Sequence, residues 1–190
     1  MKAPARLVTA RLELVQPAEA DVEEVFERYA SDPDVTRYLG WHRHESIADT
    51  LAFLAFSQSQ WTRWPAGPYL IRDRSTGRLL GGTGLDFDRE DEASTGYVLA
   101  KDAWGQGYAT EALAAIVGLS RRLRLVRLYA LCHPQHNASQ RVLEKGGFKR
   151  QASLIPRIDF PNLPSGTAQD VVCYELMLAP REACGRTDGK

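Results

Sequence analysis

One segment of the chain combines the residue types and the spacing needed to hold an anion: Trp104-Gly105-Gln106-Gly107-Tyr108-Ala109-Thr110-Glu111-Ala112. It follows a short apolar run and opens a helical pattern, so its free backbone N–H groups can converge on one phosphate at a helix N-terminus. The segment predicts a phosphate-binding turn, although a tight strand-to-helix turn without a ligand fits the same residues. A nucleotide-phosphate enzyme of the P-loop type is disfavoured because no lysine follows Gly107 where a P-loop would place one.

The composition indicates one globular domain without a strong charge. The 190 residues include 24 Lys and Arg against 24 Asp and Glu, and 44% are hydrophobic. This balance provides no global attraction for nucleic acid or an anionic membrane. We expect a domain over residues 1–180 and a polar, disordered tail over residues 181–190.

Several absences of pattern point to the cytoplasm. The N-terminus lacks the apolar stretch of a signal peptide, and no run approaches transmembrane length. The three cysteines, Cys132, Cys173 and Cys184, have neither metal-ligand spacing nor a disulfide-framework pattern. We therefore expect a cytoplasmic protein without a metal.

The hydrophobic periodicity predicts elements that would position the glycine turn in an α+β fold. Seven strands are expected, at residues 6–15, 68–73, 78–87, 96–100, 126–132, 148–153 and 170–178. The charged link 88–93 separates two of them. The passage from residue 96 to residue 132 predicts parallel strands joined by a helix, and the hairpins make the rest of the sheet antiparallel.

Four helices are expected beside this sheet. The first begins at Pro17 and ends at residues 31–34, and the second begins at Ser46, where Asp49 completes a capping box. The expected apolar face of the second helix consists of Ile47, Leu51 and Leu54. The third helix follows the glycine turn, and the fourth spans residues 137–146.

Five segments, in this order, resemble the GNAT superfamily of acyl-CoA N-acyltransferases, and within it the RimJ/RimL branch of ribosomal-protein N-terminal acetyltransferases. They are residues 9–14, 31–39, 96–99, 104–112 and 138–148. The resemblance implies a GNAT-like mixed sheet of about seven strands with about four helices. It also implies direct transfer of an acetyl group from acetyl-CoA to a primary amine, on a protein N-terminus or a small molecule, by a monomer or homodimer. The alternative is a GNAT-like module that binds acyl-CoA without catalysis.

The same resemblance implies a binding site for the acetyl donor. Backbone groups that would hold the pyrophosphate belong to Gln106, Gly107, Tyr108, Ala109 and Thr110. Backbone groups that would pair with the pantetheine amides belong to Val98, Leu99 and Ala100. His136 stands where the family often has asparagine and would reach a cofactor amide or carbonyl, whereas Asn137 either joins this contact or caps the helix.

The catalytic groups implied by the resemblance are less uniform. Leu143 stands where many members carry a tyrosine that protonates the departing thiolate, so Ser139 is the implied hydroxyl near the sulfur, unless it caps the helix. Ser94 replaces a glutamate found in some members. The candidate bases are Asp86, Glu92 and Asp170, each of which fits a solvated or structural role as well, and the amine can also react without a dedicated base.

The resemblance places the acceptor amine between the connection of the first two helices and the loop before the last strand. The first of these segments offers Arg37, Tyr38, Trp41 and His42, and the second offers Arg157, Asp159 and Phe160. These mixed charges and aromatic rings do not select a peptide over a small amine.

Overall fold

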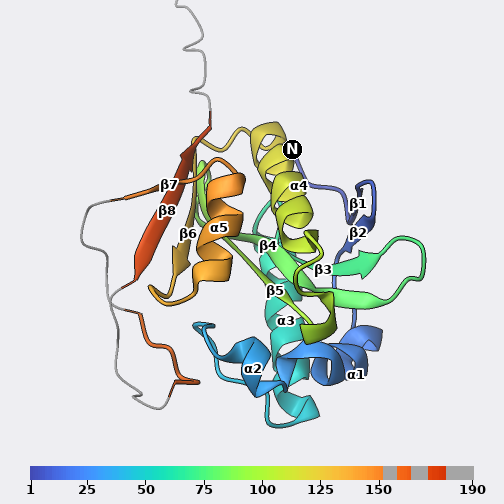
Figure 1. Ribbon diagram of the computed structural model, residues 1–190. Helices are drawn as coiled ribbons and strands as arrows, with labels where there is room; N and C mark the ends of the chain where they lie inside the picture. The colour runs from blue at the N-terminus through green and yellow to red at the C-terminus, as the bar shows by residue number, and fades with distance from the viewer. Residues whose placement is uncertain (152–157, 164–170, 179–190) are drawn as a thin grey trace, which may run out of the picture.

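An eight-stranded sheet forms the centre of the computed structural model, which describes residues 1–151, 158–163 and 171–178 (Figure 1). The strand order is β1-β2-β3-β4-β5-β6-β8-β7. Among the described strands, β5 and β6 form the parallel pair and all other neighbours are antiparallel. The strands are β1 (Arg6–Val8), β2 (Leu12–Val15), β3 (Pro68–Asp73), β4 (Leu79–Arg89), β5 (Glu92–Leu99), β6 (Arg127–Cys132), β7 (Lys149–Arg150) and β8 (Val172–Met177).

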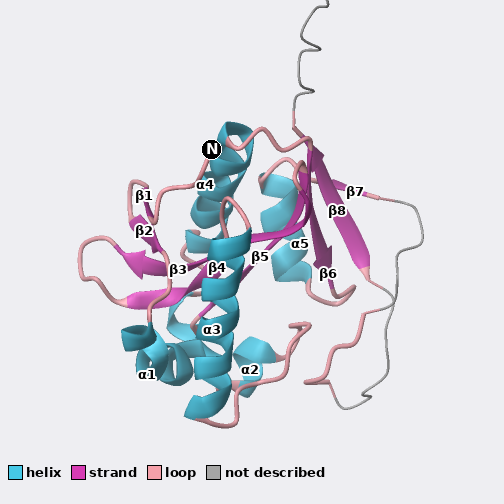
Figure 2. Ribbon diagram, turned by 180° about the vertical axis from the view of Figure 1, so that it is seen from behind, coloured by secondary structure: helices cyan, strands magenta, loops and turns pink. Residues whose placement is uncertain are grey.

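Helices cover both faces of this sheet. They are α1 (Val22–Val25), α2 (Pro33–Thr36), α3 (Ile47–Arg63), α4 (Tyr108–Arg122) and α5 (Asn137–Lys145), with 3-10 turns at Glu19–Asp21 and Lys101–Ala103 and a π-helical segment at Phe26–Ala30. Helices α4 and α5 lie on one face, and α3 crosses the other with α1 and α2 beside it (Figures 1 and 2).

Two apolar clusters hold the layers together. The larger one joins the sheet to α4 and α5, and includes the fully buried Leu113 and Ile116. The smaller one lies beneath the first helices and includes Val25, Tyr29 and Leu79. Together they confirm the expected α+β class, and the parallel pairing of β5 with β6 confirms the expected strand–helix–strand unit.

The strand count exceeds the prediction by one because residues 6–15 form a hairpin. Strands β1 and β2 pair antiparallel, and the backbone N–H of Thr9 donates to the carbonyl of Leu12 at 2.9 Å. The link expected at residues 88–93 is also shorter than predicted, since β4 continues to Arg89 and β5 begins at Glu92.

The helix boundaries near the N-terminus differ from the prediction. Pro17 lies outside the first helical turn, which begins at Glu19. Asp32 does more than end a helix, because its carboxylate accepts the N–H groups of Asp34 at 2.8 Å and Val35 at 3.3 Å and so caps the extra helix α2.

Helix α3 begins where predicted but buries a different face. The Asp49 carboxylate accepts the N–H of Ser46 at 2.9 Å. Ile47 and Leu51 are 37% and 40% exposed, so the expected apolar face is wrong for both. The buried face consists of Thr50, Leu54, Ser57 and Trp61. Two of these buried residues, Thr50 and Ser57, are small and polar, so a search for apolar residues alone overlooks them.

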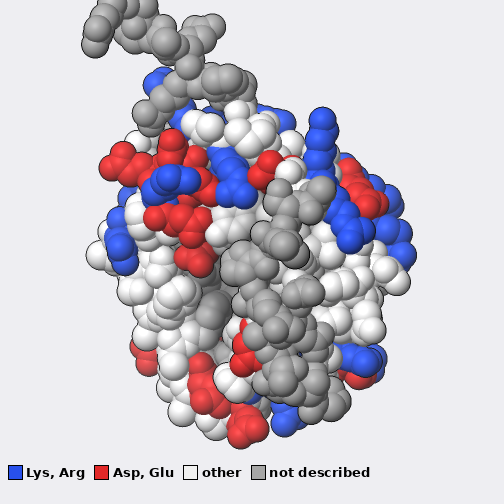
Figure 3. All heavy atoms as spheres, turned by 90° about the vertical axis from the view of Figure 1, so that its left-hand side faces the viewer, with Lys and Arg blue, Asp and Glu red and all other residues white. Residues whose placement is uncertain are grey.

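The charged surface is mixed. On the face shown in Figure 3, acidic and basic side chains alternate over the upper part of the molecule. Within the described residues, no helix is both long and apolar enough to cross a membrane.

Candidate active site

The centre of the sheet opens where β5 and β6 separate. Their ladder comprises three residue pairs and ends at Ser94 and Tyr129. Beyond this point the strands border a cavity of about 1410 Å³. Residues of α5 line it on one side of the sheet, and residues from the π-helical segment, α2 and α3 line it on the other. The cavity therefore connects the two faces through the gap between the strands.

A hydroxyl pair lies on the α5 side of this gap. The Tyr97 hydroxyl lies 3.0 Å from Ser139 Oγ and donates to the Ser139 carbonyl oxygen at 2.9 Å. Burial raises the pKa of Tyr97, so its phenol is protonated near neutral pH. Burial also raises the pKa of the neighbouring Cys132 thiol. Tyr97, Ser139 and Cys132 all line the cavity.

A carboxylate lies on the other face. Asp86 of β4 pairs with Ser94 of β5, and both line the cavity. The adjoining Leu85 and Phe87 point into the larger core, so by strand alternation Asp86 points away from α4. Its side chain is solvent-accessible, yet surrounding protein atoms and the charge of Asp88 raise the pKa of its carboxyl.

The glycine turn has the backbone conformation that its residues predict. Gly105 and Gly107 have φ angles of 75° and 81°, a left-handed region that favours glycine, and Gly107 immediately precedes α4. A Cβ added at Gly107 would come within 3.5 Å of the Arg11 guanidinium. Because Gly107 has no side chain, an anion can approach the first backbone N–H groups of α4 closely, as anion binding at a helix N-terminus requires.

The β1–β2 hairpin braces this turn. The Glu111 carboxylate accepts the Thr9 hydroxyl at 2.6 Å and the Arg11 backbone N–H at 2.8 Å. Arg11 Nε donates to the same carboxylate at 2.7 Å, and Arg11 Nη1 donates to the Gln106 carbonyl at 2.9 Å. Its guanidinium also lies 4.6 Å from the centre of the Tyr108 ring.

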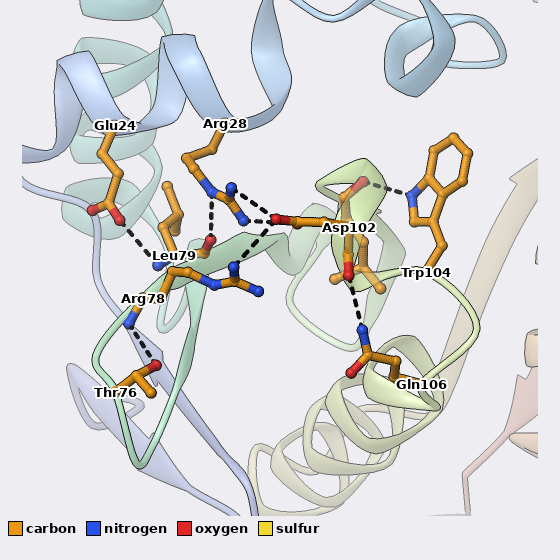
Figure 4. Close-up of polar contacts among 9 residues, drawn as sticks. Glu24, Arg28, Thr76, Arg78, Leu79, Asp102, Trp104 and Gln106 are labelled. Carbon is orange, nitrogen blue, oxygen red and sulfur yellow. Dashed lines mark hydrogen bonds and ion pairs between the residues drawn. The ribbon is translucent and has the colours of Figure 1, made fainter.

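A second brace holds the residues just before the turn (Figure 4). Asp102 accepts two hydrogen bonds from Arg28, at 2.8 and 3.1 Å, and one from Arg78 at 3.2 Å. Hydrogen bonding to Arg28 lowers the pKa of Asp102, despite an opposing contribution from burial. The Gln106 side-chain amide donates to the Asp102 carbonyl at 2.8 Å. The turn is therefore tied to Arg78, which directly precedes β4, and to Arg28 of the π-helical segment.

Comparisons with known proteins agree with this geometry. The family described as Acetyltransferase (GNAT) domain matches residues 11–149. The chain belongs to this family.

Relatives and solved structures extend the match over most of the chain. The Bacillus subtilis protein YoaA, named an uncharacterized N-acetyltransferase, is 29% identical over 184 residues, which cover 93% of this chain and 98% of YoaA. A RimL ribosomal L7/L12 α-N-protein acetyltransferase in complex with coenzyme A has the same fold, with a TM-score of 0.78 at 21% identity over 90% of this chain and 97% of RimL. The microcin C7 self-immunity acetyltransferase MccE, in complex with acetyl-CoA and AMP, gives a TM-score of 0.79 at 17% identity. The match covers 93% of this chain and 98% of MccE.

The protein is therefore an acetyl-CoA-dependent N-acetyltransferase of the GNAT family, and its acceptor is an amine. The RimL structure contains coenzyme A, and the MccE structure contains acetyl-CoA and AMP.

The cavity lies beside a different part of β5 from the residues expected to bind pantetheine. It is lined by Ser94 to Val98, whereas Leu99 and Ala100 are buried outside it. The Leu99 carbonyl accepts the Trp104 indole N–H at 2.8 Å, and the Ala100 N–H donates to Leu80 at 2.8 Å. Val98 keeps its proposed role, but these two backbone groups are already engaged.

Two of the three site residues predicted around the start of α5 line the cavity. His136 and Ser139 line it, and Asn137 does not. Asn137 is the first residue of α5 and His136 occupies the capping position, so the predicted Asn137 cap is wrong. Ser139 lies inside the helix and contacts Tyr97, which also removes the cap interpretation for Ser139.

Glu92 does not reach the cavity. Its carboxylate is paired with the guanidinium groups of Arg89 and Arg127. Burial raises the pKa of Glu92, but the hydrogen bonds to these arginines outweigh it and give a net lowering. A buried carboxylate held by two cations is a poor proton acceptor, so Glu92 is withdrawn as a candidate base.

Only some of the residues predicted to bind the acceptor line the cavity. Tyr38, Trp41, His42 and Phe160 line the cavity. Arg37 and Asp159 are exposed and are not among its lining residues. Arg157 and Asp170 lie outside the described residues, as does the tail at 181–190.

Two functional candidates escaped the sequence analysis. Tyr97 and Arg11 both belong to segments that carry the family resemblance, but the sequence analysis assigned no role to either residue. The signal for Arg11 is the charge of Glu111 in the glycine turn, which lies 100 residues along the chain. The signal for Tyr97 is its place on β5, which alternates toward α5.

Proposed function

We propose that the protein transfers the acetyl group directly from acetyl-CoA to a neutral primary amine in a ternary complex. The observation that carries this proposal is the arrangement of two proton-transfer groups around the β5–β6 gap. Asp86 faces the cavity from one side of the sheet, and the Tyr97–Ser139 pair faces it from the other. In the reaction, the amine nitrogen forms a bond to the acetyl carbon and the carbon–sulfur bond breaks.

On the donor side, Tyr97 and Ser139 supply a proton to the departing thiolate. The raised pKa of Tyr97 keeps its hydroxyl protonated, and its hydrogen bond orients Ser139 at 3.0 Å. Tyr97 thus takes the role that the family tyrosine has in other members, where this chain has Leu143. General acid catalysis of this kind is worth about 10²–10⁴-fold, and the low end is expected because a thiolate leaves readily.

On the acceptor side, Asp86 takes the proton that the amine must lose, directly or through one water. Its pKa is raised, which makes it a better base than an aspartate with an ordinary pKa. An α-amino group, with an ordinary pKa of about 8, needs less help than a lysine, with an ordinary pKa of about 10.4.

The glycine turn holds the pyrophosphate of acetyl-CoA. Backbone N–H groups from Gln106 to Thr110 are the donors, and Arg11 and Glu111 fix the turn in place. The left-handed conformation of Gly107 and the bare backbone before α4 fit this role.

Initial-rate kinetics test the proposal. Release of the coenzyme A thiol is measured while acetyl-CoA and an amine are both varied, and intersecting double-reciprocal lines are expected for a ternary complex. Parallel lines would indicate an acetylated enzyme and would contradict direct transfer. Cys132 is the nucleophile nearest the hydroxyl pair, so Cys132→Ala serves as the control and is expected to retain turnover.

A further inference from the structure

The acceptor side of the cavity has a distinctive aromatic wall. Tyr38 stacks on His133 with ring centres 4.7 Å apart, and Phe160 meets the edge of His133 at 4.8 Å. These rings come from the α2–α3 connection, from the residue after β6, and from the described segment 158–163. All three side chains line the cavity.

A second aromatic group faces the same space, formed by Trp41 and His44 of the α2–α3 connection and by Phe53 of α3. The ring centres of Trp41 and Phe53 lie 5.1 and 6.3 Å from the centre of the His44 ring. Phe56, one turn further along α3, lines the cavity and is 48% exposed. A large hydrophobic side chain that faces an open cavity offers apolar area to a ligand.

The floor between these walls is bare. Gly96 of β5 pairs with Gly84 of β4, next to the pair formed by Asp86 and Ser94. Among the described residues, no atom lies within 4 Å of a Cβ added at Gly96. Gly96 thus leaves room beside Asp86 where any other residue would place a side chain.

The charges of the cavity are mainly acidic. Its described lining contains three carboxylates, Glu45, Asp49 and Asp86, against one guanidinium, Arg43. Arg43 lies 4.0 Å from Glu45, so its charge is partly compensated. Burial lowers the pKa of His44 and of His136, which keeps both rings uncharged near neutral pH. An anionic acceptor would find little compensation here.

We propose that the acceptor is a primary amine with an aromatic or bulky apolar body and no negative charge. The body packs between the two aromatic groups over the Gly96 floor, and the amine points toward Asp86 and the acetyl group. The proposal rests on the acetyl transfer argued above and deepens it, because it selects small apolar amines over acidic protein N-termini.

Matched acceptors test this inference. The kcat/KM for acetyl transfer is measured with 2-phenylethylamine, with ethylamine, which lacks the ring, with phenylalanine, which adds a carboxylate, and with an acidic peptide. Phenylethylamine is expected to exceed each of the others by about tenfold or more, since burying a phenyl group contributes that much.

Two variants on α3 and one on β5 test which residues determine the preference for an apolar body. Phe56→Ala should lower the phenylethylamine-to-ethylamine ratio about tenfold. Leu51→Ala, on an exposed part of α3 that does not line the cavity, should leave the ratio unchanged. Gly96→Val should reduce the ratio as well, because its side chain occupies the floor.

The outcomes separate this inference from the transfer reaction itself. Equal rates for phenylethylamine and ethylamine, or a preference for the acidic peptide, overturn the inference and leave acetyl transfer intact. Binding of acetyl-CoA without transfer to any of the four acceptors overturns the inference, whereas the initial-rate kinetics described above test direct transfer separately.

Discussion

At the scale of single residues, turnover is expected to depend on the hydroxyl groups of Tyr97 and Ser139. Tyr97→Phe and Ser139→Ala each remove one member of a pair that lies 3.0 Å apart in the cavity. We expect each variant to lower kcat about 10- to 100-fold, the low end for general acid assistance, with little change in the KM for acetyl-CoA. Steady-state kinetics with acetyl-CoA varied at saturating amine give both quantities.

Tyr174→Phe is the matched control for this pair. The Tyr174 hydroxyl also contacts α5, 3.0 Å from the Glu144 carboxylate, but it does not line the cavity. The Tyr174→Phe variant should therefore keep the kcat of the unmodified protein. If all three variants lose turnover equally, the effect comes from the seating of α5 and not from proton transfer.

Asp86 makes a second prediction, which depends on pH. As the base, Asp86 must be ionised, and its raised pKa moves the acidic limb of the rate profile above the ordinary aspartate range. Asp86→Asn should lower kcat near neutral pH by about 10²-fold. Part of this loss should be recovered toward pH 9–10, roughly where amines lose their own proton in solution.

Asp88→Asn controls for charge alone. Asp88 lies two residues from Asp86, outside the cavity lining, and its charge contributes to the raised pKa of Asp86. This variant should shift the acidic limb to lower pH and retain kcat. An Asp86→Asn enzyme with the same profile as the unmodified protein would exclude Asp86 as the base.

At the scale of elements, the glycine turn and α4 form one anion-binding unit. Gly107→Ala places a Cβ on the backbone that approaches the pyrophosphate, so the Kd for coenzyme A should rise at least about tenfold. Gly77→Ala is a matched control, because Gly77 has a similar φ of 74° and lies in the β3–β4 turn. Both variants should lose about 1–2 kcal/mol of stability from the left-handed conformation, whereas only Gly107→Ala should weaken binding. Calorimetric titration and thermal melts measure the two effects.

The β1–β2 hairpin holds the glycine turn in place through side-chain contacts. Arg11→Ala removes the contacts to Glu111 and to the Gln106 carbonyl, which leaves the turn less fixed. We expect a rise of several-fold in the KM for acetyl-CoA at nearly constant kcat, with partial recovery in Arg11→Lys. Arg6→Ala removes the exposed Arg6–Glu13 pair of the same hairpin and should change neither constant. A fall in kcat at unchanged KM would contradict the bracing role of Arg11.

The elements also show which features the sequence could predict. The glycine turn and α4 were predictable because their signals are local: two glycines, then an apolar stripe at helical spacing. The hairpin at residues 6–15 was not, since alternation continues through it and its stabilising partner, Glu111, lies 100 residues away. The buried face of α3 was missed because it includes Thr50 and Ser57, which are small polar residues and give no apolar signal. Tyr97 was overlooked for a similar reason, as its partner Ser139 belongs to a helix that only the tertiary fold brings near.

At the scale of the whole molecule, the sheet consists of two halves that meet at a short ladder. One half runs from β1 to β5 and the other comprises β6, β8 and β7, and three residue pairs join them. The cavity lies along this boundary, with the π-helical segment, α2 and α3 on one side and α5 on the other. A ligand in the gap would contact both halves at once, so its binding should stabilise the molecule as a unit.

This coupling gives a final prediction. Coenzyme A at about 100 times its Kd should stabilise the folded state by about 2.7 kcal/mol, which corresponds to a rise of roughly 5–10 °C in Tm for a chain of this length. Amide hydrogen exchange should slow at β5 beyond Ser94 and at β6 beyond Tyr129, where the ladder ends. The β1–β2 hairpin, apart from Thr9 and Arg11, which contact the glycine-turn segment, serves as an internal reference, because it lies at the far edge of the sheet. A rise in Tm with slowed exchange confined to α4 would mean that the ligand binds the glycine turn without entering the gap between the strands.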